Sequence, residues 1–330
     1  MPPIQVGILG PGKIVERVMR DFHNCRDAMV TAVASRSLER AREAACRYGA
    51  KYAFGSYAEL AACDEVDLVY IATPHNFHCE QAVMMMRAGK HVLCEKPLAI
   101  NGEQARAMAD CARERNVFLM EAMWTRFFPA SYKLRELIAG GAIGNVAHIY
   151  AEFALVSAFD PESRLYDLSL AGGALLDLGI YPIMVATMLL GYDPVTVQGM
   201  CCLSSAGADT RSSVQFKFKS GATAQLMCAL DAFGESREII YGDRGRIIVP
   251  GFWHPTAFTL ETPDGDRREF TFAPETEGHH HQFDHACDLI RQGVCDSPVM
   301  SWDETIAIAD MFTALRREWG VEYPDEKRGL

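Results

Sequence analysis

"VGILGPGKIVERV", residues 6–18, decides how this chain folds. An apolar run that starts at Ile4 ends at Gly10-Pro11-Gly12, and a helical pattern follows from Lys13. Glycines at a strand end allow a tight turn and the close approach of a pyrophosphate, and the next helix offers unpaired N–H groups. The stretch therefore predicts a dinucleotide site, with Gly10, Gly12, Lys13 and Ile14 as candidate cofactor-binding residues. The third position of this fingerprint is Val15 rather than Gly or Ala, which predicts looser packing of the helix on the strand.

The first third of the chain continues to alternate strands with helices. After the strand at 4–9, strands are expected at 29–34, 66–72, 92–94 and 117–120. Helices are expected at 13–22, 38–48 and 77–88, with a short one after Ser56 and a long one that is capped by Asn101 and runs through Arg115. Such alternation is typical of βαβ units and predicts a doubly wound parallel sheet, the Rossmann arrangement.

The pattern changes after about residue 123. Apolar residues alternate along 147–155 and 214–218, and paired strands flank turns at 242–245 and 263–266. These hairpins predict a large, open, mainly antiparallel sheet, with helices at 174–190, 282–291 and 302–319 on one face. We therefore expect an α/β protein in which residues 1–122 form a Rossmann domain and residues 123–330 form an α+β substrate-binding and dimerisation domain. Because the other face of that sheet needs a cover, we expect a homodimer.

Composition narrows the classes of partner. The chain has 330 residues and a formal net charge of −11, and an acidic surface repels phosphate backbones and anionic lipids. We therefore expect no nucleic acid and no membrane among its partners. The apolar stretch 175–190 contains Asp177 and Pro182 and is interpreted as core, and no signal peptide fits ahead of Ile4. Eleven scattered cysteines without a CxxC pair predict reduced thiols and a cytoplasmic location.

The end of the second strand predicts the cofactor. NAD sites usually carry an acidic residue there, whereas this chain has Ser35-Arg36-Ser37 followed by Arg40. A hydroxyl and a guanidinium suit a 2′-phosphate, since arginine combines charge with a planar fork of donors. We expect NADP(H) to be preferred over NAD(H), which stays the alternative.

Several separated motifs together resemble the Gfo/Idh/MocA oxidoreductase family, and the resemblance covers essentially the whole chain. They are Gly10-x-Gly12, "ATPHNFH" at 72–78, "EKP" at 95–97 and "GGALLDLGIYP" at 172–182. The stretches "MEAMWTRFFPA" at 120–130 and "FWHPT" at 252–256 are most similar to the subgroup of trans-1,2-dihydrodiol dehydrogenases and NADP-dependent D-xylose dehydrogenases. The resemblance implies a Rossmann domain followed by an α+β domain, and it supports a homodimer.

Polar residues follow three of the predicted parallel strands. Ligands bind beyond the carboxyl ends of such strands, so these residues are expected to converge on the cofactor. His78 is expected to pack beneath it, and the Lys96–Pro97 bond is predicted to be cis. Glu95 could hold Lys96 or bind the nicotinamide ribose. The candidate residues are Thr73, Pro74, His75, Asn76 and His78 after one strand, Glu95 and Lys96 after the next, and Trp124 and Arg126 after the third.

The catalytic candidates are Lys96, Tyr181 and Asp177. Lysine has no structural reason to lie at a buried strand end, which favours a role for Lys96 as a cation beside a substrate oxygen. The resemblance implies that Tyr181 is the acid/base, since it occupies the family's His/Tyr position. Asp177 precedes Tyr181 by four residues and would share a helical face with it, orienting the substrate or Lys96. Alternatively, Tyr181 packs in the core at a helix start, and Asp177 bonds nearby backbone.

Aromatic residues are candidates for the walls of a substrate site. Trp124, Phe153 and Trp253 could pack against the C–H surface of a sugar or cyclic diol. Phe153 lies on the apolar face of a strand, which favours the core, so Trp253 in its Gly/Pro-rich loop is the better candidate. The run His279–His281 invites a metal interpretation, but neighbouring histidines point in different directions and no second ligand cluster is apparent. We expect no metal.

Three functions remain open at this stage. The first is an NADP-dependent oxidoreductase that transfers a hydride between the nicotinamide and a carbinol carbon of a pyranose or cyclic vicinal diol, with Lys96 and Tyr181 assisting proton transfer. The second is a glycoside-cleaving enzyme that uses tightly bound NAD(P) through a transient oxidation. The third is a non-catalytic NADP-sensing protein. The sequence determines neither the substrate nor the physiological direction.

Overall fold

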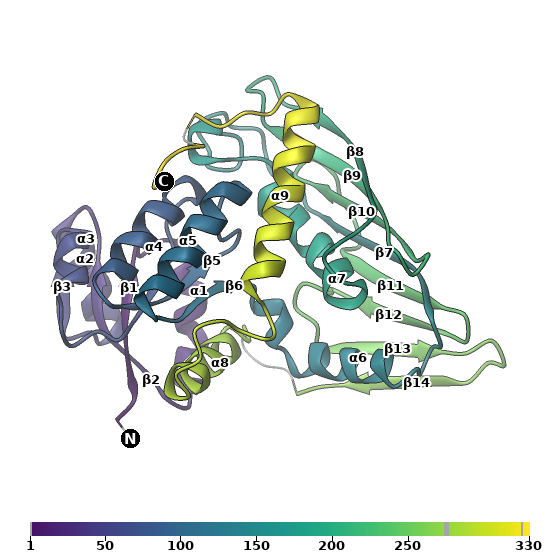
Figure 1. Ribbon diagram of the computed structural model, residues 1–330, viewed down its shortest axis with the longest axis horizontal. Helices are drawn as coiled ribbons and strands as arrows, with labels where there is room; N and C mark the ends of the chain where they lie inside the picture. Colours follow the sequence, from purple (N-terminus) through teal and green to yellow (C-terminus); the bar gives the residue numbers. More distant parts are fainter. Residues whose placement is uncertain (1, 274–276, 325) are drawn as a thin grey trace. The chain divides into compact units, whose positions relative to one another are not determined.

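A computed structural model describes residues 2–273, 277–324 and 326–330 of the chain. It contains two compact units. The first unit comprises residues 1–124, 275–306 and 325–330, and the second comprises residues 125–274 and 307–324. Each unit is built around its own sheet, labelled strand by strand in Figure 1.

The sheet of the first unit has six parallel strands in the order β3-β2-β1-β4-β5-β6. The order reverses beside β1, as in a doubly wound Rossmann sheet, so the predicted fold class is confirmed. Residues of β4 and β5 are buried on both faces, which explains their uninterrupted apolar sequence. The strands are β1 (Ile4–Leu9), β2 (Ala28–Ala34), β3 (Tyr52–Phe54), β4 (Leu68–Ile71), β5 (His91–Glu95) and β6 (Leu119–Ala122).

The helices of the first unit begin where the sequence carries caps. Ser56 forms a complete capping box with Glu59, and the Asn101 side chain accepts a hydrogen bond from the Gln104 amide. The short strand β3 was not predicted. The helices are α1 (Lys13–Asp21), α2 (Leu38–Tyr48), α3 (Tyr57–Ala61), α4 (His78–Arg87), α5 (Gly102–Arg115) and α8 (His280–Arg291).

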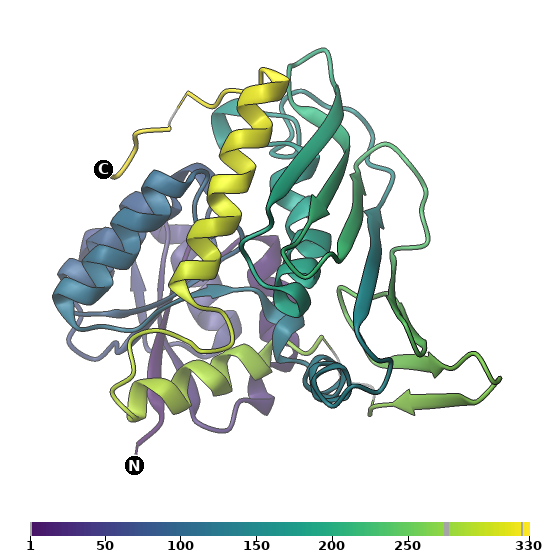
Figure 2. The same cartoon turned by 45° about the vertical axis from the view of Figure 1, so that its right-hand side comes forward.

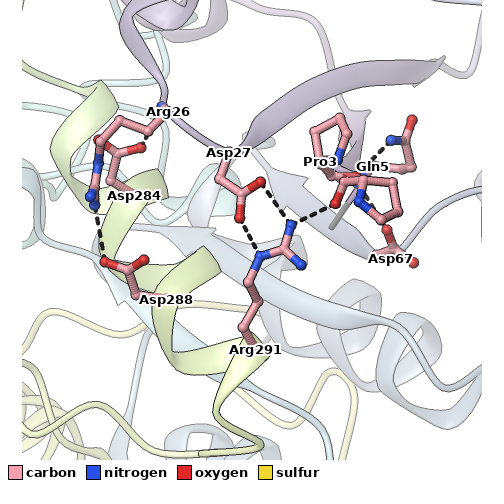
Figure 3. Close-up of polar contacts among 9 residues, drawn as sticks. Pro3, Gln5, Arg26, Asp27, Asp67, Asp284, Asp288 and Arg291 are labelled. Carbon is pink, nitrogen blue, oxygen red and sulfur yellow. Dashed lines mark hydrogen bonds and ion pairs between the residues drawn. The ribbon is translucent and has the colours of Figure 1, made fainter.

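Helix α8 explains why the units differ from the domain limits 1–122 and 123–330 expected from the sequence. It follows the second sheet along the chain, yet ion pairs bind it to the segment just before β2 (Figure 3). Arg26 lies 3.1 Å from Asp284 and 3.0 Å from Asp288, measured between side-chain nitrogen and oxygen. Arg291 donates to both carboxylate oxygens of Asp27. These long-range contacts place α8 in the first unit.

The second unit contains a mixed sheet of eight strands in the order β14-β13-β12-β11-β7-β10-β9-β8. Every neighbouring pair is antiparallel except β7 and β10, which are parallel. The predicted hairpins are therefore confirmed. The strands are β7 (Val146–Ala154), β8 (Thr196–Leu203), β9 (Asp209–Lys217), β10 (Thr223–Ala229), β11 (Arg237–Gly242), β12 (Arg246–Pro250), β13 (Ala257–Glu261) and β14 (Arg267–Thr271).

Helices of the second unit lie along one face of this sheet (Figure 2). They are α6 (Pro129–Ala139), α7 (Ile180–Leu190) and the later part of α9 (Trp302–Trp319), which begins in the first unit. Helix α6 was not predicted. Residues 168–190 are long and apolar enough to cross a membrane by length and composition, but 83% of their most apolar window is buried in the protein. Such burial is typical of a core helix.

Candidate functional site

The turn between β1 and α1 brings the main chain close to β4. Gly10 adopts a φ of +84°, and a β-carbon there would lie 2.6 Å from the Thr73 Cγ2 atom. Gly12 is the N-cap of α1 and has no side chain to occupy the helix N-terminus. The turn therefore leaves a backbone cradle at the positive end of a helix, which fits the pyrophosphate of a dinucleotide.

A cavity of about 320 Å³ lies beside this turn, within the first unit. Seven of the predicted cofactor residues line it, and they come from the ends of β1, β2 and β4. Tyr57, Phe77, Gln81, Met84 and Arg328 also line it and were not predicted. The seven predicted residues are Gly10, Gly12, Ser35, Arg36, Arg40, Thr73 and Pro74.

The segment after β2 forms the basic wall of this cavity. Ser37 is the N-cap of α2, and its hydroxyl accepts a hydrogen bond from the Arg40 amide at 3.3 Å. That cap fixes the start of α2, so that Arg36 reaches the cavity from just before the helix and Arg40 from its first turn. Burial raises the pKa of the Tyr57 phenol, while the charges of Arg36 and Arg40 lower it. The wall thus carries two guanidinium groups at the position where NAD sites have a carboxylate.

The other predicted cofactor residues do not line the cavity. His78 is fully buried and links two strand ends, because its ring nitrogens lie 2.9 Å from the Thr73 and Pro97 carbonyl oxygens. Burial lowers the pKa of this imidazole. The cofactor contacts of the remaining predicted residues, which also do not line the cavity, stay predictions. These residues are Lys13, Ile14, His75, Asn76, Glu95, Lys96, Trp124 and Arg126.

The end of β5 places Lys96 at the edge of the parallel sheet. The Lys96–Pro97 peptide is cis, as predicted. Glu95 is buried and accepts a hydrogen bond from the Tyr70 hydroxyl, so its carboxylate is held by the neighbouring strand β4. Lys96 itself is half-buried.

The histidine run forms part of a contact between α8 and α1. The His279 ring stacks on Trp124 with ring centres 4.0 Å apart, and His280 Nδ1 lies 3.2 Å from an Asp21 carboxylate oxygen. Glu277 pairs with Arg17 in the same region. Across the described ranges, no three His, Cys, Asp or Glu side chains gather in a way that could hold a metal ion.

Asp177 and Tyr181 lie in the second unit, at the entry to α7. The chain forms a π-helical turn over Leu175–Gly179 rather than the predicted α-helix, and Asp177 lies in that turn. The Asp177 side chain is 10% exposed, and its carboxylate lies 3.2 Å from the Arg164 guanidinium. Sequence reasoning missed Arg164, which precedes Asp177 in an irregular segment with no motif of its own.

Three predicted substrate residues form one aromatic cluster. The Phe153 ring contacts the Tyr181 ring edge-on at 5.1 Å and stacks on Trp253 at 5.5 Å, measured between ring centres. The Trp253 carbonyl oxygen accepts a hydrogen bond from Thr125, which ties the loop of Trp253 to the start of the second unit. The cluster places a phenol beside two flat apolar surfaces.

Arg126 belongs to the second unit rather than to the edge of the parallel sheet. Its side chain is buried, and Nη2 donates to the Met184 carbonyl oxygen at 3.3 Å. The structure therefore places Arg126 in the packing of α7, and Arg126 is not among the residues that line the cavity.

Comparisons with known proteins agree with this arrangement. Residues 4–123 match the family model described as an oxidoreductase family with an NAD-binding Rossmann fold, and residues 132–248 match the Gfo/Idh/MocA C-terminal domain. The chain belongs to the Gfo/Idh/MocA oxidoreductase family. It is therefore an NAD(P)-binding oxidoreductase of the dehydrogenase and reductase type, and the glycines and arginines of the cavity fit such a cofactor.

Members of the Gfo/Idh/MocA family resemble this chain along most of its length. The trans-1,2-dihydrobenzene-1,2-diol dehydrogenases of Mus musculus and Homo sapiens are each 34% identical to it, over 91% of this chain and 91% of the relative. A 3-ketoreductase from Actinomadura kijaniata, solved with TDP-benzene and NADP, superposes with a TM-score of 0.82 at 26% identity, covering 95% of this chain and 97% of that one. An aldose-aldose oxidoreductase from Caulobacter crescentus, complexed with glycerol, superposes with a TM-score of 0.87 at 25% identity, covering 96% of this chain and 98% of that one.

Proposed function

We propose that this protein is an NADP-preferring dehydrogenase, or the reverse carbonyl reductase, acting on a CH–OH group of a cyclic vicinal diol or a pyranose sugar. The observation that carries the proposal is the cluster in which Tyr181 lies against Phe153, which stacks on Trp253. Aromatic faces pack against the C–H surfaces of rings, while a phenol can exchange a proton with a ring hydroxyl. The names of the relatives, diol dehydrogenases and an aldose-aldose oxidoreductase, support the same substrate class.

The preference for NADP rests on the basic wall of the cavity. Arg36 and Arg40 line it together with Ser35, and Glu80 is the one carboxylate among the described residues that line it. Guanidinium groups favour a 2′-phosphate, whereas a carboxylate at this position would favour a free ribose hydroxyl. The ketoreductase of Actinomadura kijaniata, solved with NADP, supports this proposal.

The proposed chemistry assigns one task to each catalytic residue. When bound, a nicotinamide would supply the hydride acceptor for the carbinol carbon. Tyr181 accepts the hydroxyl proton, and the Lys96 ammonium stabilises the developing alkoxide. An unperturbed tyrosine has a pKa of about 10, so a neighbouring positive charge is needed to make Tyr181 a base near neutral pH. Asp177, held by Arg164, orients the substrate.

Solved structures give this assignment indirect support. Those of the Actinomadura kijaniata ketoreductase include variants in which a lysine is replaced by alanine or glutamate, and one in which a tyrosine is replaced by phenylalanine. These are the two residue types that we propose for proton transfer.

The test measures NADPH formation from NADP⁺ with a panel of aldoses, inositols and dihydrodiols. Lys96→Met and Tyr181→Phe should each lower kcat by roughly 100-fold or more, because general acid–base assistance typically contributes that much. Tyr192→Phe changes an exposed tyrosine in the same way and should leave turnover unaltered. Unchanged turnover in both site variants would remove Lys96 and Tyr181 from the mechanism, and equal kcat/KM with NAD⁺ would contradict the cofactor preference.

We also propose that the protein is a homodimer joined through the open face of the second sheet. Along β9, buried residues alternate with exposed ones, and along β8, half-buried residues alternate with exposed ones. Met200, on the exposed face of β8, is 74% exposed. The same face has a hollow lined by His148, Gln198 and Gln225, among others. A second copy would cover this face through a self-complementary contact, as in most homo-oligomers.

A further inference from the structure

The last described residues of the chain, 326–330, dock on the first unit beside its cavity. The Glu326 and Arg328 carbonyl oxygens accept hydrogen bonds from Asn101 Nδ2 at 2.8 Å and Gln104 Nε2 at 3.0 Å. Both donors are buried side chains, and Gln104 is 0% exposed. Leaving a buried amide donor without an acceptor destabilises the fold, so these two hydrogen bonds favour the docked position of the segment.

Gly329 shows how closely the segment approaches α4. Its φ is +82°, a conformation that residues with a β-carbon rarely adopt. A β-carbon at this position would lie 2.6 Å from the Glu80 amide nitrogen. The Cys79 thiol also donates to the Gly329 carbonyl oxygen, with 3.6 Å between sulfur and oxygen. The segment therefore fits a defined surface at the start of α4.

This docking brings Arg328 to the wall of the cavity. Its guanidinium carbon lies 4.8 Å from the centre of the Phe77 ring, and Nη1 lies 3.6 Å from a Glu80 carboxylate oxygen. Phe77, Glu80 and Arg328 all line the cavity that contains Gly10 and Gly12. The Arg328 side chain is 34% exposed, so part of its surface is open to the cavity or to solvent.

The surroundings of Arg328 differ from those of Arg36 and Arg40. Glu80 partly neutralises the Arg328 charge, which makes this guanidinium a poorer partner for a phosphate. The guanidinium carbon lies over the Phe77 ring, as in a cation–π contact. A planar guanidinium can also stack on an aromatic ligand. Arg328 is therefore better placed to stack on a nucleobase than to bind an anion.

We propose that residues 326–330 form part of the dinucleotide site and that Arg328 stacks on the adenine ring of the cofactor. The inference rests on the proposed function, since it takes the cavity to be the site of the adenosine half. Arg36 and Arg40 would then recognise the 2′-phosphate, and Arg328 would recognise the ring that NADP and NAD share. Arg328 is a binding residue that does not discriminate between the two cofactors.

Calorimetric titration of NADPH and NADH tests this division of roles. Arg328→Ala should raise the Kd for both nucleotides by a similar factor of roughly 5 to 10, the range of an exposed or partly desolvated cation–π contact. Arg328→Gln, which keeps a planar group, should restore part of the affinity. Arg42→Ala removes an exposed arginine of α2 that does not line the cavity and should leave both Kd values unchanged. A variant lacking residues 325–330 should match Arg328→Ala, with far-UV circular dichroism confirming that it folds.

The possible results distinguish a failure of this inference from a failure of the proposed function. Unaltered Kd values in both Arg328→Ala and the shortened variant would overturn the inference alone. A loss confined to NADPH would overturn the stacking role and assign Arg328 to the phosphate. Failure of the wild-type protein to bind either nucleotide would instead overturn the proposed function, and the inference with it.

Discussion

Glu238 is a carboxylic acid in an apolar environment. It lies on β11, buried beneath α6 and α7, beside a small cavity of about 10 Å³ lined mainly by apolar side chains. Thr125 and Ser131 also line this cavity, but their hydroxyls donate to the carbonyl oxygens of Trp253 and Thr125. Within the described residues, Glu238 Oε1 has no hydrogen-bond partner. Burial raises the pKa of Glu238 to about 8.

This raised pKa predicts how stability varies with pH. The folded protein holds a proton on Glu238 up to about pH 8, whereas an unfolded chain releases it near its ordinary pKa of about 4.3. Stability should therefore fall as pH rises between those values, by at most about 1.4 kcal/mol per pH unit. Glu238→Gln should remove this slope, so that the melting temperatures of variant and wild type diverge from pH 5 to pH 8. Glu235→Gln, at an exposed position nearby, should keep the wild-type profile; an identical profile for Glu238→Gln would contradict the prediction.

Contacts between elements explain what the sequence could and could not predict. The caps of α3 and α5 were predictable because each lies within four residues of its partner. Three other contacts could not be predicted, since each joins segments that only the fold brings together. They are the Arg164–Asp177 pair, the hydrogen bonds of His78 to two loops and the ion pairs that attach α8. The contacts of the three neighbouring histidines, for which we expected no metal, were equally beyond the sequence, since His280 bonds to Asp21 of α1.

The contact of α1 with α8 predicts a second pH effect. Burial would raise the pKa of Asp21, but hydrogen bonds from His280 and the Gly278 amide lower it below the ordinary value. A carboxylate with a lowered pKa stabilises the fold above its unfolded pKa of about 3.9, and this contribution is lost as pH falls through the folded value. Asp21→Ala should cost about 1–3 kcal/mol at pH 7, because it leaves buried donors without a partner. The difference from wild type should shrink below about pH 4.

Thermal unfolding at pH 7 and at pH 3.5 measures this difference. Asp110→Ala breaks an exposed ion pair with Arg113 and serves as the control, since such pairs contribute little. Equal stability of Asp21→Ala and wild type at pH 7 would show that α8 does not depend on this contact.

At the scale of the whole molecule, the amino-acid pattern predicted two sheets but not how the chain divides between them. Strand alternation and hairpin turns are local, so both sheet types could be recognised from the sequence. Residues 275–306 and 325–330 nevertheless belong to the first unit, although they follow the second sheet along the chain. The second of these returning segments supplies Arg328 to the cavity, a residue that no motif indicated.

The proposed dimer predicts the mass of the protein in solution. The open face of the second sheet carries exposed Gln225 on β10 and Met200 on β8, and no described helix of the second unit covers it (Figure 2). Light scattering should give twice the chain mass of 36.6 kDa. Gln225→Arg should shift the protein toward the monomer, because a charge placed within a self-complementary interface must lose its water. Gln292→Arg makes the same change at an exposed position after α8 and should leave the mass unaltered. A wild-type mass equal to that of one chain would refute the dimer.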